Sequence, residues 1–168
     1  LQKHDHWRLL FIGNGPELEE YKELSVTLGV GEQVIFAGAR PWDNIGLYYQ
    51  LGNVFVSASR SETQGLTYIE SMAAGLPVLA RRDPCLDLVI VEGKNGYMYD
   101  SEAEFAASIE QLAASDELRD RLSAAALDHA TTFSAQQFAR RMTSLYRDVQ
   151  GRFTDNIIQT EDVSFRFR

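Results

Sequence analysis

The sequence has little of what a disulfide-stabilised or metal-centred protein needs. Its 168 residues include one cysteine, Cys85, and three histidines. A single cysteine excludes an internal disulfide framework and a cysteine-rich zinc site, and the histidines form no His-Glu-x-x-His metal motif. No apolar run is long enough to span a bilayer, so the sequence does not encode an integral membrane domain.

Positive charge is also scarce. Lys and Arg together number 16 against 24 Asp and Glu, which gives a formal net charge of −8. The only adjacent basic pairs are Arg81-Arg82 and Arg140-Arg141, so no dense basic patch compensates for this balance. An acidic chain without such a patch binds polyanions poorly, and nucleic acid is therefore not expected as the main partner.

The first residues do not predict a signal peptide, and they are not typical of the natural N-terminus of a complete protein. Residues 1–7 contain no basic region followed by an apolar one, as a secretory signal requires. An apolar strand is predicted almost at once, within residues 8–12. We therefore expect this sequence to be a fragment of a longer chain, with a further segment upstream.

Short apolar runs alternate with helical patterns through the first half of the chain. Runs that are apolar throughout are typical of parallel strands covered on both faces, and the alternation predicts a doubly wound α/β sheet of Rossmann type. Pro16 and Pro41 are each expected near the first position of a helix. The predicted strands lie within residues 8–12, 34–38, 54–58 and 77–80, and the predicted helices lie at 16–28, 41–49 and 67–74.

The second half is predicted to be mostly helical. Ser101-x-x-Glu104 and Ser134-x-x-Gln137 are capping boxes, and each precedes a helical pattern. In the last helix an apolar face is formed by Phe138, Met142, Leu145, Tyr146 and Val149. After Gly151 this pattern dissolves, so we expect one domain over residues 1–150 and a tail over residues 151–168. The whole is predicted as one α/β domain with a helical C-terminal region.

The segment from Ser59 to Pro77 carries the predicted chemistry. It follows the third strand, at the carboxyl end of a parallel strand, where open α/β sheets bind ligands. Gly65 allows a ligand to approach the backbone closely. The exposed N–H groups of the helix that follows favour an anion such as phosphate.

Two carboxylates, Glu62 and Glu70, lie on either side of this helix start. Carboxylates repel phosphate but accept hydrogen bonds from the paired hydroxyls of a ribose or a sugar. Two diols joined by a diphosphate describe a nucleotide sugar, which is the ligand class this pattern predicts. The alternative is that both carboxylates only complement the helix dipole, and on spacing alone the two interpretations have equal weight.

The stretch Glu62-Thr-Gln-Gly-Leu-Thr-Tyr-Ile-Glu70, followed by Ser-Met-Ala-Ala-Gly-Leu-Pro-Val78, resembles the Glu-x7-Glu signature of retaining family 4 (group 1) glycosyltransferases with the GT-B fold. The segments at residues 11–16, 34–38 and 54–59 match the same family in the same order. The resemblance covers roughly residues 8–150, which corresponds to the C-terminal, donor-binding domain of such enzymes.

The resemblance implies a role for each matching residue. Glu70 would bind the ribose hydroxyls, and Glu62 would contact the transferred sugar and stabilise positive charge at its anomeric carbon. The backbone of residues 64–67 would hold the sugar and diphosphate, and the loop at Arg40 would lie against the nucleobase. The donor site implied by the resemblance comprises Gln64, Gly65, Leu66, Thr67 and Glu70, with Arg40 and Gly13, and no metal or other cofactor.

The resemblance also implies what lies outside this sequence. The family's basic residues that clamp the diphosphate precede the matching region, and its acceptor site belongs to a separate N-terminal domain. We therefore expect the fragment to bind donor weakly and to be inactive alone. Asp83-Pro84-Cys85-Leu86 and Gln64 resemble bacterial diacylglycerol glucosyltransferases. This narrower likeness implies UDP-glucose as donor, a lipid acceptor met through the N-terminal domain, and a cytoplasmic location at the membrane surface.

Alternatives to a sugar transferase follow from the same sequence. A non-catalytic GT-B relative that acts as a binding or chaperone domain would keep the fold without needing Glu62 and Glu70. A GT-B sugar-nucleotide epimerase would fit the Ser-Glu-Thr-Gln-Gly loop less well. A hydride-transfer enzyme is disfavoured, because the third position of a Gly-x-Gly-x-x-Gly motif at Gly13 is Leu18. Tyr48, Tyr49 and Tyr68 are expected to pack in the core rather than stack on a base.

Overall fold

Parallel strands form the layer on which the functional loops are built. The computed structural model describes the backbone of residues 1–159 and the side chains of residues 1–152. Its strands pair in two sheets, one with the order β1-β2 and one with the order β3-β4-β5, and all pairs are parallel. The strands are β1 (Leu9–Phe11), β2 (Val34–Phe36), β3 (Phe55–Ser57), β4 (Val78–Arg81) and β5 (Gly96–Tyr99).

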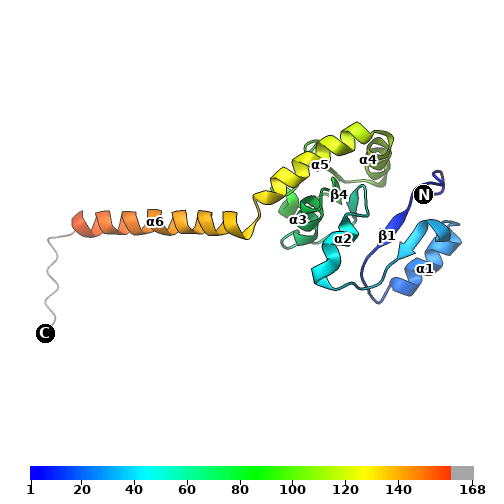
Figure 1. Ribbon diagram of the computed structural model, residues 1–168, viewed down its shortest axis with the longest axis horizontal. Coiled ribbons are helices and arrows are strands. Elements are labelled where there is room, and N and C mark those ends of the chain that lie inside the picture. Colours follow the sequence, from blue (N-terminus) through cyan, green and yellow to red (C-terminus); the bar gives the residue numbers. More distant parts are fainter. Residues whose placement is uncertain (160–168) are drawn as a thin grey trace.

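Helices connect the strands and then form the C-terminal part (Figure 1). The expected α/β architecture with parallel strands is confirmed. Three short 3₁₀ helices lie at Gly31–Gln33, Trp42–Asn44 and Pro84–Leu86. The α-helices are α1 (Leu18–Thr27), α2 (Ile45–Tyr49), α3 (Leu66–Ala73), α4 (Glu102–Ala114), α5 (Asp116–Thr131) and α6 (Ala135–Gln159).

The core lies on both faces of β4, because successive side chains of a strand point to opposite faces. Val78 and Ala80 belong to a cluster formed with residues of α3, β5 and α5. Leu79 belongs to a second cluster, with residues of β5, α4 and α5. All three β4 side chains are fully buried, so the three-stranded sheet is covered on both faces as the apolar sequence predicts.

Strand β5 was not predicted from the sequence. It begins with Gly96, and glycine disfavours strands, so the local pattern there is weak. Tertiary packing explains the glycine, because a Cβ at position 96 would lie 2.3 Å from the carbonyl oxygen of Val78. Only glycine allows β5 to pair this closely with β4.

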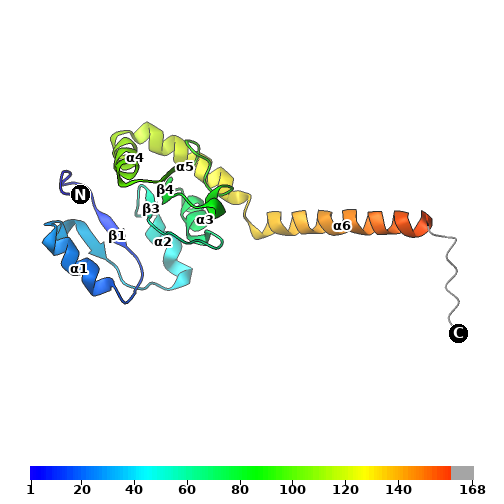
Figure 2. The ribbon, with the colours of Figure 1, turned by 180° about the vertical axis from the view of Figure 1, so that it is seen from behind.

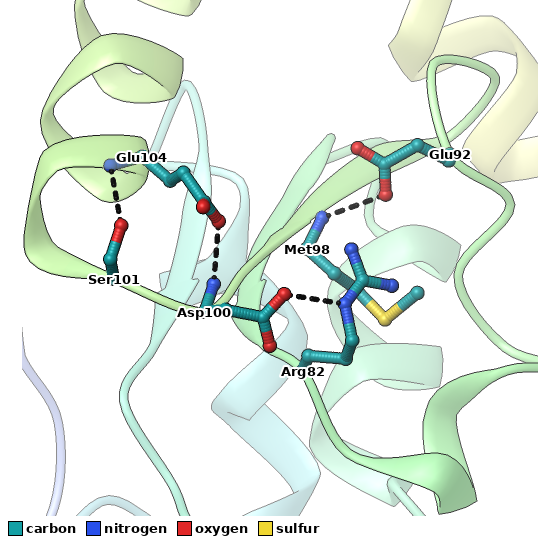
Figure 3. A network of polar contacts seen from close by, with 6 residues as sticks. All are labelled: Arg82, Glu92, Met98, Asp100, Ser101 and Glu104. Carbon is teal, nitrogen blue, oxygen red and sulfur yellow. Dashed lines mark hydrogen bonds and ion pairs between the residues drawn. The ribbon is translucent and has the colours of Figure 1, made fainter.

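Polar contacts fix the junction between β5 and α4 (Figure 3). Ser101 accepts a hydrogen bond from the Glu104 N–H at 3.2 Å, which confirms the predicted cap. The Glu104 carboxylate accepts from the Asp100 N–H at 2.8 Å, rather than from the Ser101 N–H. Asp100 also pairs with Arg82 at 2.9 Å, which ties the end of β5 to the residue that follows β4.

Several helix boundaries differ from the sequence prediction. The helix expected over residues 41–49 is a 3₁₀ helix at Trp42–Asn44, preceded by Pro41, followed by α2 from Ile45. Helix α1 begins at Leu18 with Glu17 as its N-cap residue, so Pro16 precedes the helix instead of opening it. Helix α6 continues through Gly151 to Gln159, so the predicted loss of the helical pattern after Gly151 is wrong. The rest of the predicted tail, residues 160–168, lies outside the described residues.

Helix α6 extends away from the α/β body (Figures 1 and 2). The predicted cap is present, since the Gln137 N–H donates to Ser134 Oγ at 3.3 Å. The apolar residues Phe138, Leu145 and Tyr146 are exposed, because no other described element covers them. Within residues 1–159, no helix combines the length and hydropathy needed to cross a membrane.

The close approach of β4 and β5 gives a test of this packing. Gly96→Ala is expected to lower the free energy of unfolding by about 3 kcal/mol or more, because the new methyl group overlaps backbone that cannot rotate away. Gly46→Ala is the matched control, since a Cβ there meets nothing within 4 Å. Urea unfolding of both variants checks this, and equal stability would contradict the packing described.

Candidate functional site

The candidate site is built on the turn that joins β3 to α3. Gly65 is the N-cap residue of α3, with a left-handed backbone (φ 64°, ψ 32°). A Cβ at this buried position would lie 2.9 Å from Leu86 Cδ2. Both observations disfavour larger residues, so the glycine allows the chain to turn sharply from the sheet edge into the helix.

The first turn of α3 presents unpaired backbone donors. The N–H groups of Tyr68 and Ile69 donate to the Gly65 carbonyl oxygen, whereas those of Leu66 and Thr67 precede the first intrahelical bonds. The side chains of Leu66 and Thr67, like that of Gln64, are exposed. No acidic side chain occupies this first turn, so the positive end of the helix is open to an anion.

Glu62 lies in the loop before α3 and is held by a buried tyrosine. The Tyr68 hydroxyl lies 3.1 Å from Glu62 Oε1 and 2.8 Å from Ser57 Oγ. Ser57 is the last residue of β3, and Tyr68 is fully buried in α3. This contact therefore fixes the carboxylate of Glu62 relative to both the strand and the helix.

Glu70 is held in the same way by a second tyrosine. The Tyr49 hydroxyl, from the end of α2, donates to Glu70 Oε2 at 3.2 Å. Phe55 of β3 makes edge-on contacts with both tyrosine rings, with centroid distances of 5.8 Å to Tyr49 and 5.5 Å to Tyr68. One cluster of Tyr49, Phe55 and Tyr68 therefore supports both carboxylates from the protein core.

Both tyrosines are neutral donors. Burial, followed by the nearby Glu70 carboxylate, raises the pKa of Tyr49 to about 12. Burial also raises the pKa of Tyr68 to about 12, with a further contribution from Glu62. No described Lys or Arg side chain forms a salt bridge with either glutamate. Each carboxylate keeps acceptor capacity for further hydroxyl groups.

An open groove of about 410 Å³ lies beside Glu70. One wall is formed by Trp42, Ile45 and Gly46, and another by Glu70 and the following turn of α3. The Trp42 side chain is 78% exposed, which leaves one of its faces free to stack on a planar ligand. The groove therefore combines a hydroxyl acceptor with an aromatic surface.

The structure brings some of the predicted site residues together and not others. Glu62 contacts Tyr68 in the first turn of α3, and the side chains of Gln64, Leu66 and Thr67 are exposed at the same helix start. Arg40 lies just before the segment that lines the groove, with its guanidinium 5.3 Å from the centre of the Tyr48 ring. Gly13 lies beside Gly38 through a 3.0 Å backbone hydrogen bond, and no described contact joins it to Glu62 or Glu70.

The roles of Tyr49 and Tyr68 were not predicted from the sequence. Their burial agrees with the expected core packing, but their hydroxyls also orient the two carboxylates. Tyr68 lies six residues after Glu62, and Tyr49 lies 21 residues before Glu70. The Glu62–Tyr68 pair could have been suggested by their proximity across the helix start, whereas the Tyr49 contact depends on how α2 packs against α3.

Cys85 is not an activated thiol. Burial raises its pKa, and the nearby Asp83 and Glu62 carboxylates raise it further. A raised pKa disfavours the thiolate form that a nucleophile requires. The residue instead packs against the core cluster that includes Leu86.

Comparison with known proteins gives matches over most of the chain. Residues 1–129 match the family model described as glycosyl transferases group 1. An alpha-monoglucosyldiacylglycerol synthase from Streptococcus pneumoniae is 34% identical over 99% of the chain. The chain spans 38% of the length of that relative.

Solved structures share the same fold. The C-terminal domain of the group 1 glycosyl transferase LpcC from Francisella tularensis superimposes with a TM-score of 0.69 at 28% identity, covering 79% of this chain and 72% of that domain. The pneumococcal O-GlcNAc transferase GtfA, solved with UDP and GlcNAc, gives a TM-score of 0.72 at 23% identity, covering 85% of this chain and 29% of its own.

The two tyrosines predict how stability depends on pH. Because their folded-state pKa lies above the unfolded value of about 10, their contribution to the unfolding free energy is complete below pH 10. It is lost as the pH rises from 10 to about 12. We expect urea unfolding at several pH values to show this decline.

Tyr49→Phe and Tyr68→Phe isolate these contributions. Each keeps the ring in the aromatic cluster and removes one hydroxyl, at a cost of about 1 kcal/mol at neutral pH. Each variant should lose less stability than the parent between pH 10 and 12. Tyr146→Phe, on the exposed face of α6, is the matched control. Identical pH dependence in all four proteins would contradict the assignment.

Proposed function

The chain belongs to the group 1 glycosyltransferase family and has the fold of a GT-B C-terminal domain, and from this premise we propose that it binds the nucleotide-sugar donor of a retaining hexosyltransferase. The arrangement around α3 carries the proposal. One fixed carboxylate precedes the open N-terminus of the helix, and another follows it. Carboxylates that accept hydrogen bonds from hydroxyl groups thus lie on both sides of a helix end that favours an anion. This arrangement matches a nucleoside diphosphate sugar, whose diphosphate lies between a ribose and a sugar.

Each part of the donor then has a partner. The Leu66 and Thr67 N–H groups donate to the diphosphate, and Glu70 accepts from the ribose hydroxyls. The nucleobase occupies the groove next to Trp42, near the loop of Arg40, and the turn at Gly13 belongs to the same donor site. The hexose lies toward Gln64 and Glu62, at the end of β3. No metal is assigned a role in this scheme.

The chemistry follows from where charge develops. When the bond between the hexose and the diphosphate breaks, negative charge grows on the leaving phosphate and positive charge on the anomeric carbon. The helix end stabilises the first charge, and the Glu62 carboxylate stabilises the second. The Tyr68 hydroxyl positions Glu62 for this role without supplying a counter-charge of its own.

For the donor and acceptor we propose UDP-glucose and a diacylglycerol lipid, with the reaction at the cytoplasmic face of the membrane. The name of the S. pneumoniae relative, a glucosyldiacylglycerol synthase, supports the sugar and the lipid. UDP in the solved structure of GtfA supports the nucleotide. The lipid would bind to polypeptide outside residues 1–168. The same polypeptide would supply the residues that complete the donor site.

Donor binding can be tested by NMR titration of the chain with UDP, UDP-glucose and GDP-mannose. We expect UDP and UDP-glucose to shift the amides of residues 64–70 and the Trp42 indole. Glu70→Gln keeps an acceptor for Tyr49 but weakens the interaction with ribose hydroxyls, so it should raise the Kd about tenfold.

Glu23→Gln, an exposed substitution on α1, is the matched control and should leave the Kd unchanged. An unchanged affinity in Glu70→Gln would show that Glu70 is not a donor ligand. Shifts confined to residues outside the site would contradict the proposed location. A larger response to GDP-mannose than to UDP-glucose would overturn the proposed nucleotide and sugar.

A further inference from the structure

The sequence contains two Asn-Gly pairs, Asn14-Gly15 and Asn95-Gly96. Asparagine is chemically labile, and it is most labile before glycine, because glycine has no β-carbon to shield its backbone nitrogen from the asparagine side chain. The two pairs have the same local chemistry. They differ in exposure and in hydrogen bonding, so the structure predicts different fates for them.

The first pair is exposed and unrestrained. Asn14 and Gly15 lie outside helices and strands, in the turn between β1 and α1 (Figure 1). Among residues 1–152, whose side chains the structure describes, no hydrogen bond holds the Asn14 carboxamide. The backbone hydrogen bonds of this turn use the Gly13 N–H and the Gly15 carbonyl oxygen, not the Gly15 N–H. The carboxamide and the nitrogen that follows it can therefore approach one another.

The second pair is buried and fully bonded. Asn95 has no exposed surface, and its Oδ1 accepts from the Val91 N–H at 2.8 Å. Its Nδ2 donates to the Val89 carbonyl oxygen at 3.0 Å and contacts Met72 Sδ at 3.3 Å. Turning this carboxamide toward the Gly96 nitrogen would break these contacts and leave buried polar groups unpaired, which is costly.

We propose that Asn14 is a site of spontaneous deamidation and that Asn95 is protected from the same reaction. The Gly15 nitrogen attacks Asn14 Cγ and forms a new C–N bond. The bond from Cγ to Nδ2 breaks, and ammonia leaves with the proton of the Gly15 nitrogen. Water then opens the cyclic imide at either carbonyl carbon, which gives aspartate on the original backbone or isoaspartate, whose backbone runs through Cγ.

Both products change the turn that joins the ends of β1 and β2. The Gly13 N–H donates to the Gly38 carbonyl oxygen at 3.0 Å, and Asn14 Oδ1 lies next to Gly38, where a Cβ would meet it at 3.7 Å. Each product places a negative charge there. Isoaspartate also adds a methylene group to the backbone, so we expect it to displace the bond between Gly13 and Gly38. Any effect on donor binding rests on the proposed function, whereas the modification does not.

Peptide mass mapping tests the modification directly. The 168-residue chain is incubated at mildly alkaline pH, where the attacking nitrogen loses its proton more readily, and is then digested at acidic pH. We expect the Asn14 peptide to gain the mass difference between an amide and an acid at least about tenfold faster than the Asn95 peptide. Methylation by a protein isoaspartate methyltransferase should label only the Asn14 peptide.

Gly15→Ala is the matched variant. A Cβ at this position meets nothing within 4 Å, so the fold should be kept while the added methyl group slows the attack about tenfold. In concentrated urea both asparagines of the parent chain should react at similar rates, because tertiary protection of Asn95 is then lost. An Asn14 that reacts in urea but stays intact in the folded chain would overturn the proposal. Equal rates at Asn14 and Asn95 in the folded chain would overturn the protection by burial.

The effect on the turn has its own readout. Asn14→Asp carries the new charge on an unaltered backbone, so it separates the effect of charge from that of isoaspartate. In aged protein we expect a Gly13 amide signal that differs from the signals of both the parent and Asn14→Asp. An unaltered Gly13 signal in protein that contains isoaspartate would contradict the displacement of the turn. A displaced turn with unchanged affinity for UDP would contradict the place of Gly13 in the donor site and would leave the modification established.

Discussion

The turn at Gly65 is the constraint on which the candidate site depends. A left-handed backbone at this position directs the chain from the end of β3 into α3. The lack of a side chain also lets Leu86 pack against the turn. Because α3 begins directly after this turn, its first N–H groups are exposed at the edge of the sheet. Glu62 and Glu70 are placed on either side of them by the same turn.

The carboxylates are oriented without being neutralised. A lysine or arginine partner would fix each glutamate but would also occupy its lone pairs and offset its charge. Buried tyrosine hydroxyls fix the same groups with a single neutral hydrogen bond, and burial keeps them protonated. Phe55 joins both tyrosines in one cluster, so the same aromatic cluster supports the two residues that hold the glutamates.

The two sheets differ in how completely they are covered. The three-stranded sheet is covered on both faces and carries the Glu62–Glu70 segment, whereas β1, β2 and α1 retain exposed apolar surface. The segment before β1 contacts α4 through a polar pair, His4 with Glu110, at 2.7 Å.

Local patterns in the sequence determined the parallel α/β class, four of the five strands within residues 1–159, the helix caps at Ser101 and Ser134, and the glycine turn between two carboxylates. These features depend on hydrophobic periodicity and on residues close together in the chain. Tertiary structure decided what depends on distant contacts: β5 exists because Gly96 allows close pairing with β4, and Tyr49 reaches Glu70 because α2 packs against α3. It also decided that the apolar side chains of Tyr21 and Leu24 on α1 are exposed, because a helical pattern specifies an apolar face but not the element that covers it.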